Sequence, residues 1–188
     1  MLASTAEFRK GLRVLVDNEP YVIVEFQHVK PGKGGAFVRT RLKSLVSGNV
    51  LDRTFRSGDK LELPEMEERD MQFLYKEGDR YFFMDTNNYD QFDIGEEYLG
   101  DAKNYLKEGL VIEVLMYQGR TIGVEVQNFV SLKIVSTEPG AKGDTAQNAT
   151  KPAVLETGYT IQVPLFVEQG ETVRIDTRTG QYMDRVKE

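Results

Sequence analysis

Short apolar stretches separated by turn-forming residues recur along almost the whole chain. They are rich in Val, Ile, Phe, Tyr and Thr, and Gly, Asn, Asp or Pro lies between them, which is the pattern of strands and turns. The clearest stretches span residues 21–26, 36–42, 80–85, 110–117, 121–126, 129–135, 160–167 and 172–177. No long helical period accompanies them. The pattern predicts an all-β protein built from small barrels or sandwiches.

The best helical candidate lies in the middle of the chain, over residues 95–107. Its apolar side chains recur roughly on one face of a helix: Tyr98, Leu99, Ala102 and Leu106. Gly100 weakens the candidate, because glycine costs about 1 kcal/mol relative to alanine inside a helix. This segment is nevertheless the best candidate for a helix in the chain.

Changes in composition divide the chain into three segments. The sequence turns from basic to acidic across Pro64, and a second, weaker boundary lies near Gln127. The expected domains span residues 1–63, 64–127 and 128–188. Residues 136–153 contain no apolar side chain larger than alanine. Because only two clear strands follow them, too few for a separate barrel, we expect a long loop inside the third domain.

Composition removes several classes of chemistry. The 188 residues include no cysteine and one histidine, His28. Disulfides, thiolate catalysis and cysteine zinc sites are therefore excluded, and few ways remain to build a metal site or a histidine relay. No apolar run approaches the ~18 residues of a membrane span, and residues 1–11 lack a hydrophobic signal core. We expect a cytoplasmic protein with no membrane partner, metal or cofactor.

The net charge of −6 hides an uneven distribution. Residues 1–63 carry 11 Lys and Arg against 7 Asp and Glu, a net of +4. Residues 64–127 carry 6 against 15, a net of −9, and residues 128–188 carry 7 against 8, a net of −1. A basic end therefore permits a nucleic-acid partner that the overall charge would disfavour.

Two of the expected strands flank the sequence KPGKGG, residues 30–35, which isolates Lys33 among glycines. We expect a hairpin with this lysine at its tip. Written with a period of two, the strand after the tip has one cationic face, formed by Arg39, Arg41 and Lys43. Because Lys and Arg provide most contacts to phosphate backbones, this pattern favours a basic hairpin that binds structured RNA or DNA. The alternative is the solvated face of an ordinary sheet.

The sequence supports other kinds of functional site less well. The loop lacks the spacing of a P-loop, and Gly34 follows Lys33 where that motif has Ser or Thr. A catalytic lysine needs a desolvated amine, which a glycine-rich tip disfavours, so we expect no catalytic residue here. The acidic residues within 65–70 and 90–97 lack the spacing of a calcium loop and indicate a solvated face. Residues 176–182 have the turn chemistry of a hairpin.

Period two also places His28 on one face with Val22, Val24 and Phe26. This pattern indicates a packed or rim histidine and not a metal ligand.

Three motifs in this order and spacing resemble the bacterial elongation factor P family over essentially the full chain. They are KPGKGGAFVRTRLKSL, TEPGAKGDTAQNATKPAVLETGYTIQVPLFVEQGE and VRIDTRTGQYMDRV. The related initiation factor five A of eukaryotes and archaea lacks a third domain, so the residues after Gln127 favour the bacterial factor. The resemblance implies an SH3-like (KOW-type) barrel followed by two OB folds, in an L-shaped, tRNA-like arrangement.

The resemblance also implies a function. Members bind the ribosome between the P and E sites and promote peptide-bond formation on peptidyl-tRNA stalled at consecutive prolines. The tip lysine, here Lys33 within the loop Pro31, Gly32, Gly34 and Gly35, approaches the peptidyl-transferase centre, and in many members an enzyme extends it, for example by β-lysylation. Implied partners are both ribosomal subunits, P-site peptidyl-tRNA, ribosomal RNA, mRNA and a lysine-modifying enzyme.

Further site residues follow from the same resemblance. Gly143, Asp144 and Thr145 match the loop associated with the E-site codon, and Tyr182 and Arg185 match terminal positions linked to ribosome function. The protein is then expected to be a monomer and not an enzyme. The alternatives are an elongation-factor-P-like paralogue with another stalling preference, a generic ribosome- or RNA-binding initiation module, and a lysine-dependent catalyst.

Overall fold

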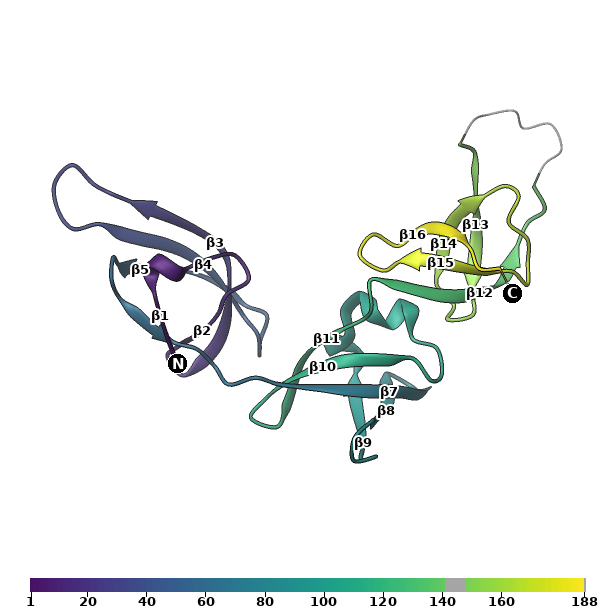
Figure 1. The fold of residues 1–188 in the computed structure, drawn as a ribbon, viewed down its shortest axis with the longest axis horizontal. Helices are drawn as coiled ribbons and strands as arrows, with labels where there is room; N and C mark the ends of the chain where they lie inside the picture. Colours follow the sequence, from purple (N-terminus) through teal and green to yellow (C-terminus); the bar gives the residue numbers. More distant parts are fainter. Residues whose placement is uncertain (141–147, 188) are drawn as a thin grey trace. The chain divides into compact units, whose positions relative to one another are not determined.

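The computed structural model describes residues 1–140 and 148–187 of the chain (Figure 1). Within these residues strands predominate, in agreement with the hydrophobic pattern, and the helices are single turns or short 3-10 segments. The strands form four sheets. None of the helices in the described ranges is long and apolar enough to span a bilayer.

The N-terminal sheet has the order β2-β3-β4-β5 and carries the hairpin. Its strands are β2 (Arg13–Val16), β3 (Glu19–Val29), β4 (Phe37–Ser44) and β5 (Val50–Arg56). A two-stranded sheet pairs β1 (Leu2–Ser4) with β6 (Lys60–Glu62), and the 3-10 helix η1 (Thr5–Glu7) follows β1. Their buried side chains form one core, which includes Val14, Ile23, Val38 and Leu42. The ends of β3 and β4 extend past this core and carry the loop at residues 30–36 (Figure 1).

A β-bulge at Val24 interrupts the alternation of β3. The inserted residue has no partner on β4, so the side chains after it change face. Phe26 and His28 consequently share the face of Ile23, and the expectation of a common face with Val22 was wrong. His28 is exposed, at the rim of the sheet, and its ring packs edge-to-face against Phe26 with 5.8 Å between ring centroids.

The middle sheet has the order β11-β10-β7-β8-β9. Its strands are β7 (Glu67–Glu77), β8 (Arg80–Asp85), β9 (Gln91–Gly95), β10 (Val111–Tyr117) and β11 (Arg120–Glu125). The expected helix is split into α1 (Glu96–Leu99) and the 3-10 helix η2 (Gly100–Tyr105). Helical structure in the candidate segment is thus confirmed, and its division at Gly100 follows because this residue adopts a φ of 53°, which no right-handed helix continues through.

The C-terminal sheet has the order β14-β13-β12-β15-β16. Its strands are β12 (Phe129–Thr137), β13 (Thr150–Leu155), β14 (Thr160–Pro164), β15 (Thr172–Asp176) and β16 (Gln181–Arg185). The antiparallel pair β15–β16 confirms the hairpin expected at residues 176–182. The expected loop at residues 136–153 was too long, because Ser136 and Thr137 pair with Val154 and Ala153 as strand residues.

The chain divides into two compact units, residues 1–67 with 116–122 and residues 68–115 with 123–188. In the second unit Tyr105, at the end of η2, belongs to the core of the C-terminal sheet. Its ring packs edge-to-face against Tyr159 with 5.8 Å between centroids. The middle and C-terminal sheets are therefore joined by shared packing. The domain boundaries and the L-shaped arrangement stay predictions.

Candidate nucleic-acid interface

The loop between β3 and β4 presents Lys33 without a partner. Every residue from Lys30 to Gly35 is exposed, and Lys33 makes no hydrogen bond or ion pair with any described residue. Gly34 adopts a φ of 102°, which favours glycine, whereas Gly35 does not have a positive φ. No atom lies within 4 Å of where a Cβ on Gly32 or Gly35 would be. The loop therefore holds one amine in open space.

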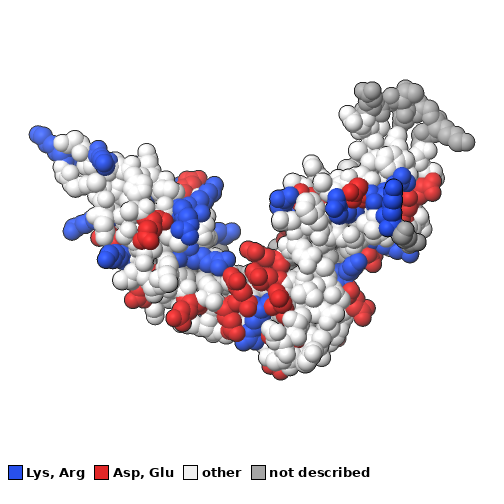
Figure 2. All heavy atoms as spheres, in the orientation of Figure 1, with Lys and Arg blue, Asp and Glu red and all other residues white. Residues whose placement is uncertain are grey.

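The cations of β4 lie on the face that the alternation predicted. Arg39, Arg41 and Lys43 are exposed, and Val38, Thr40, Leu42 and Ser44 between them are buried. Figure 2 shows Lys and Arg atoms at the free end of the β3–β4 hairpin. The structure thus brings the predicted cations to one surface below the Lys33 loop.

Arg41 differs from its two neighbours because the sheet itself binds it. Its Nε donates to Oδ1 of Asp52 on β5 at 3.0 Å, and its Nη1 lies 3.6 Å from Oε2 of Glu25 on β3. The hydrogen bond to Asp52 is the main cause that raises the pKa of Arg41 above its ordinary value. Part of the hydrogen-bonding capacity of Arg41 is therefore used across three strands.

Arg39 and Lys43 are not engaged in this way by any carboxylate that the structure describes. Among the described residues neither forms an ion pair with a carboxylate. The Arg39 guanidinium lies over the Phe37 ring, 5.6 Å from its centroid, a contact that occupies none of its hydrogen-bond donors. Lys43 lies opposite Val22 and Val50, which cannot neutralise it. Of the three cations on β4, these two are therefore the ones whose charge is not compensated by a carboxylate of the described residues.

A concave surface pocket with a volume of about 730 Å³ lies over β3, β4 and β5. Its lining consists of Glu25, Phe26, Gln27, Arg39, Thr40, Arg41, Asp52, Arg53 and Thr54. Arginines and carboxylates are mixed in it, and Arg53 is itself paired with Asp17 at 3.0 Å. The surface is therefore not a simple anion pocket, and Lys33 is not part of its lining.

The predicted residues of the C-terminal sheet have different environments. Tyr182 is half-buried against the core, and this burial raises the pKa of its hydroxyl. The Arg185 Nη1 donates to Oε1 of Glu171 at 3.1 Å, and its guanidinium lies 4.8 Å from the centroid of the exposed Phe166 ring. Gly143, Asp144 and Thr145 lie outside the described residues.

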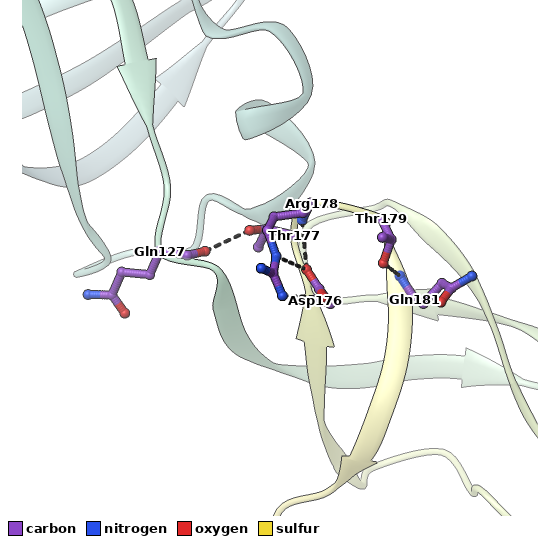
Figure 3. Close-up of polar contacts among 6 residues, drawn as sticks. All are labelled: Gln127, Asp176, Thr177, Arg178, Thr179 and Gln181. Carbon is purple, nitrogen blue, oxygen red and sulfur yellow. Dashed lines mark hydrogen bonds and ion pairs between the residues drawn. The ribbon is translucent and has the colours of Figure 1, made fainter. Parts of the chain in front are cut away.

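Sequence reasoning missed a polar network in the β15–β16 turn (Figure 3). Arg178 donates through Nε and Nη2 to the carboxylate of Asp176, at 3.0 and 2.9 Å, and these bonds are the main cause that lowers the pKa of Asp176. Thr177 Oγ1 donates to the backbone carbonyl of Gln127 at 2.7 Å, and the backbone N–H of Gln181 donates to Thr179 Oγ1 at 3.3 Å. The sequence of residues 176–182 indicated the turn, but no local signal indicates the hydrogen bond to Gln127.

Comparisons with known proteins agree along the whole chain. Three family models match: the elongation factor P KOW-like domain at residues 4–61, the elongation factor P OB domain at 66–124, and the elongation factor P C-terminal domain at 130–185. They confirm the predicted fold class of small β-barrels, with a KOW-type domain followed by OB folds.

Curated relatives and a solved structure point the same way. The elongation factor P of Moorella thermoacetica is 56% identical over 184 residues, 98% of this chain and 100% of that protein. That of Acetivibrio thermocellus is 49% identical over 185 residues, again 98% and 100%. The structure of eukaryotic translation initiation factor 5A from Methanococcus jannaschii covers 67% of this chain and 94% of its own, at 23% identity and a TM-score of 0.57, which supports the fold.

Proposed function

Because the chain belongs to the elongation factor P family of translation factors, we propose that it relieves ribosomes stalled at consecutive prolines. In this proposal it binds between the P and E sites and promotes peptide-bond formation on the stalled peptidyl-tRNA. The observation that carries the proposal is the exposed, unpartnered amine of Lys33 at the end of a hairpin with a cationic face.

The hairpin would act by position and charge. Arg39 and Lys43 would contact phosphates of the tRNA and ribosomal RNA, while Arg41 stays bound to Glu25 and Asp52 on the neighbouring strands. Lys33 would then reach the CCA end of the P-site tRNA. Holding a reactant in its productive geometry can lower a barrier by several kcal/mol, up to roughly 7–11 in ideal intramolecular reactions.

No group of this protein needs to exchange a proton in such a mechanism. Lys33 is solvent-exposed, so nothing desolvates its amine in the way that a catalytic lysine requires. The protein would therefore assist the ribosome, which performs the chemistry, and would not be an enzyme itself. It would act in the cytoplasm as a monomer.

Open space around the loop also suits a covalent extension of Lys33. Because its glycine neighbours have no side chains and no nearby atoms, a modifying enzyme can reach the amine. An added group would lengthen the reach of the hairpin without any movement of the sheet.

The C-terminal sheet would meet the small subunit. Gly143, Asp144 and Thr145 would contact the E-site codon of the mRNA. Tyr182 and Arg185 would support that contact, since Arg185 bonds Glu171 through one terminal nitrogen and keeps its other donors for RNA.

The test is translation in vitro of two messages that differ only in a run of consecutive prolines, without any other elongation factor P. We expect the native-source protein to relieve the proline stall selectively, and the Lys33→Ala variant to fail with an unchanged melting temperature. Equal help to both messages would favour a generic ribosome-binding module. Full rescue by Lys33→Ala would refute the role of the hairpin amine.

A further inference from the structure

The outer face of the β7–β8–β9 sheet carries an aromatic pair that the core does not use. The rings of Tyr75 and Phe82 are stacked, with centroids 4.6 Å apart and 15° between their planes. They lie directly opposite each other on β7 and β8, and Tyr75 is 50% exposed. A parallel, solvent-facing stack of this kind leaves an aromatic surface open to a partner.

A β-bulge creates this surface. Met71 and Phe73 are buried, so strict alternation would also turn Tyr75 toward the core. The register of β7 shifts between Phe73 and Tyr75, and the inserted residue, Leu74, turns Tyr75 outward.

The surroundings of the pair are acidic. Asp93 lies beside Phe82 on β9, and Glu77 follows Tyr75 on the same face of β7. Arg80 lies on the same face of β8, opposite Glu77, and its Nε donates to Asp93 at 2.6 Å. That hydrogen bond is the main cause that raises the pKa of Arg80, and the charges of Asp93, Glu97 and Asp79 add to it.

We propose that the Tyr75–Phe82 face binds a cationic segment of another protein, with an arginine or lysine over the Tyr75 ring. Aromatic surfaces on OB sheets commonly stack nucleobases, but they do so beside basic grooves. Here two carboxylates and one arginine flank the rings, and the remaining net negative charge would repel a phosphate backbone. The same carboxylates attract a guanidinium, which the face of an aromatic ring also attracts.

This site adds a protein contact to the proposed ribosome binding and rests on that function for its partner in the cell. Its chemistry can be tested without ribosomes. The full chain is titrated with a short peptide of alternating arginine and glycine and, separately, with a short oligouridine, while NMR follows the ring resonances of Tyr75 and Phe82.

We expect the peptide to shift both rings at low salt and the oligouridine to leave them unchanged. Tyr75→Ala should weaken peptide binding about two- to fivefold, a typical loss for an exposed cation–π contact. Tyr98→Ala is the matched control, because Tyr98 is 42% exposed beside Glu96 and Glu97 but is not part of the stack. The proposal would be overturned if the oligouridine shifts the ring resonances, or if neither ligand shifts them. Shifts that follow only from self-association of the protein would also overturn it.

A second experiment identifies the partner on ribosomes. A photoreactive p-benzoylphenylalanine replaces Tyr75, and the variant is irradiated after it has pelleted with ribosomes. A crosslink that protease removes and ribonuclease spares, in a Lys- and Arg-rich segment, supports the proposal, whereas a crosslink to RNA overturns it. If the chain does not pellet with ribosomes but its rings respond to the peptide, the proposed function fails and the docking site stands.

Discussion

Asp52 accepts a hydrogen bond from Nε of Arg41, 3.0 Å away, across the pair of strands β4 and β5. Both side chains are largely exposed, at 49% for Arg41 and 72% for Asp52, and they lie directly opposite each other in the register. Because of this contact, Arg41 is paired with a carboxylate, whereas the two neighbouring cations of β4, Arg39 and Lys43, are not paired with any carboxylate of the described residues.

The first prediction follows from this difference. Arg39→Ala and Lys43→Ala should each weaken ribosome binding and reduce the slope of log affinity against log salt by about one, because each removes a phosphate contact. Arg41→Ala should change the slope less, since Asp52 and Glu25 already compensate its charge. Filter binding or sedimentation at several salt concentrations measures these slopes. Equal slopes for the three variants would show that Arg41 leaves its carboxylates when RNA binds.

The second prediction concerns the two glycines after Lys33. Gly34→Ala should impair proline-dependent rescue, because an alanine at a φ of 102° strains the backbone by about 1–3 kcal/mol and displaces the loop. Gly35→Ala should keep most of the activity, since its φ is not positive and no atom lies within 4 Å of its Cβ position. Rescue assays on both variants, with NMR spectra of the loop, make the comparison. Equal rescue by the two variants would contradict a requirement for the observed loop conformation.

The third prediction concerns Tyr105, which is 3% exposed and packs into the core of the C-terminal sheet. Tyr105→Ala should lower the free energy of unfolding by about 3–5 kcal/mol, the usual loss for a large aromatic residue. Tyr105→Phe should cost much less, because it keeps the ring against Tyr159. Urea unfolding followed separately in the middle and C-terminal sheets tests whether both lose stability together. A loss confined to the middle sheet would mean that the shared core does not couple them.

The fourth prediction is a pH dependence. The pKa of Glu171 lies below its ordinary value of 4.5, first because the Glu168 amide donates to its carboxylate and then because Arg185 does. A depressed pKa in the folded state stabilises the protein above 4.5, and this contribution is lost as the pH falls further. Urea unfolding should therefore show stability falling below pH 4.5, with a smaller fall in Glu171→Gln.

The same sign applies to Asp176 and Glu96, whose pKa values are also lowered by hydrogen bonds, to Arg178 and Lys103. Glu171→Gln should consequently remove only part of the acid sensitivity. An unchanged pH profile in that variant would contradict the predicted contribution of the carboxylate.

The sequence alone determined the all-β fold class and the cationic face of β4. Both depend on local features: strand composition and the period of two, which continues without interruption along β4. Glycine spacing around Lys33 likewise indicated an exposed tip, and the loop is exposed. The KOW and OB assignment came from the resemblance of three motifs to a known family.

Only the tertiary structure decided on which face of the sheet the side chains after a bulge lie. Val24 in β3 and Leu74 in β7 are each the extra residue of a β-bulge, and no local pattern distinguishes such a residue from its neighbours. After each insertion every side chain changes face, which moved His28 away from its expected face and turned Tyr75 outward.

Partners across strands were equally beyond the sequence. Arg41 and Asp52 are eleven residues apart, and Tyr105 meets a core formed largely by residues after 128, so both contacts depend on register and packing. Local composition determines which residues can form strands, but the pairing of distant segments determines which charges are neutralised and which rings remain exposed.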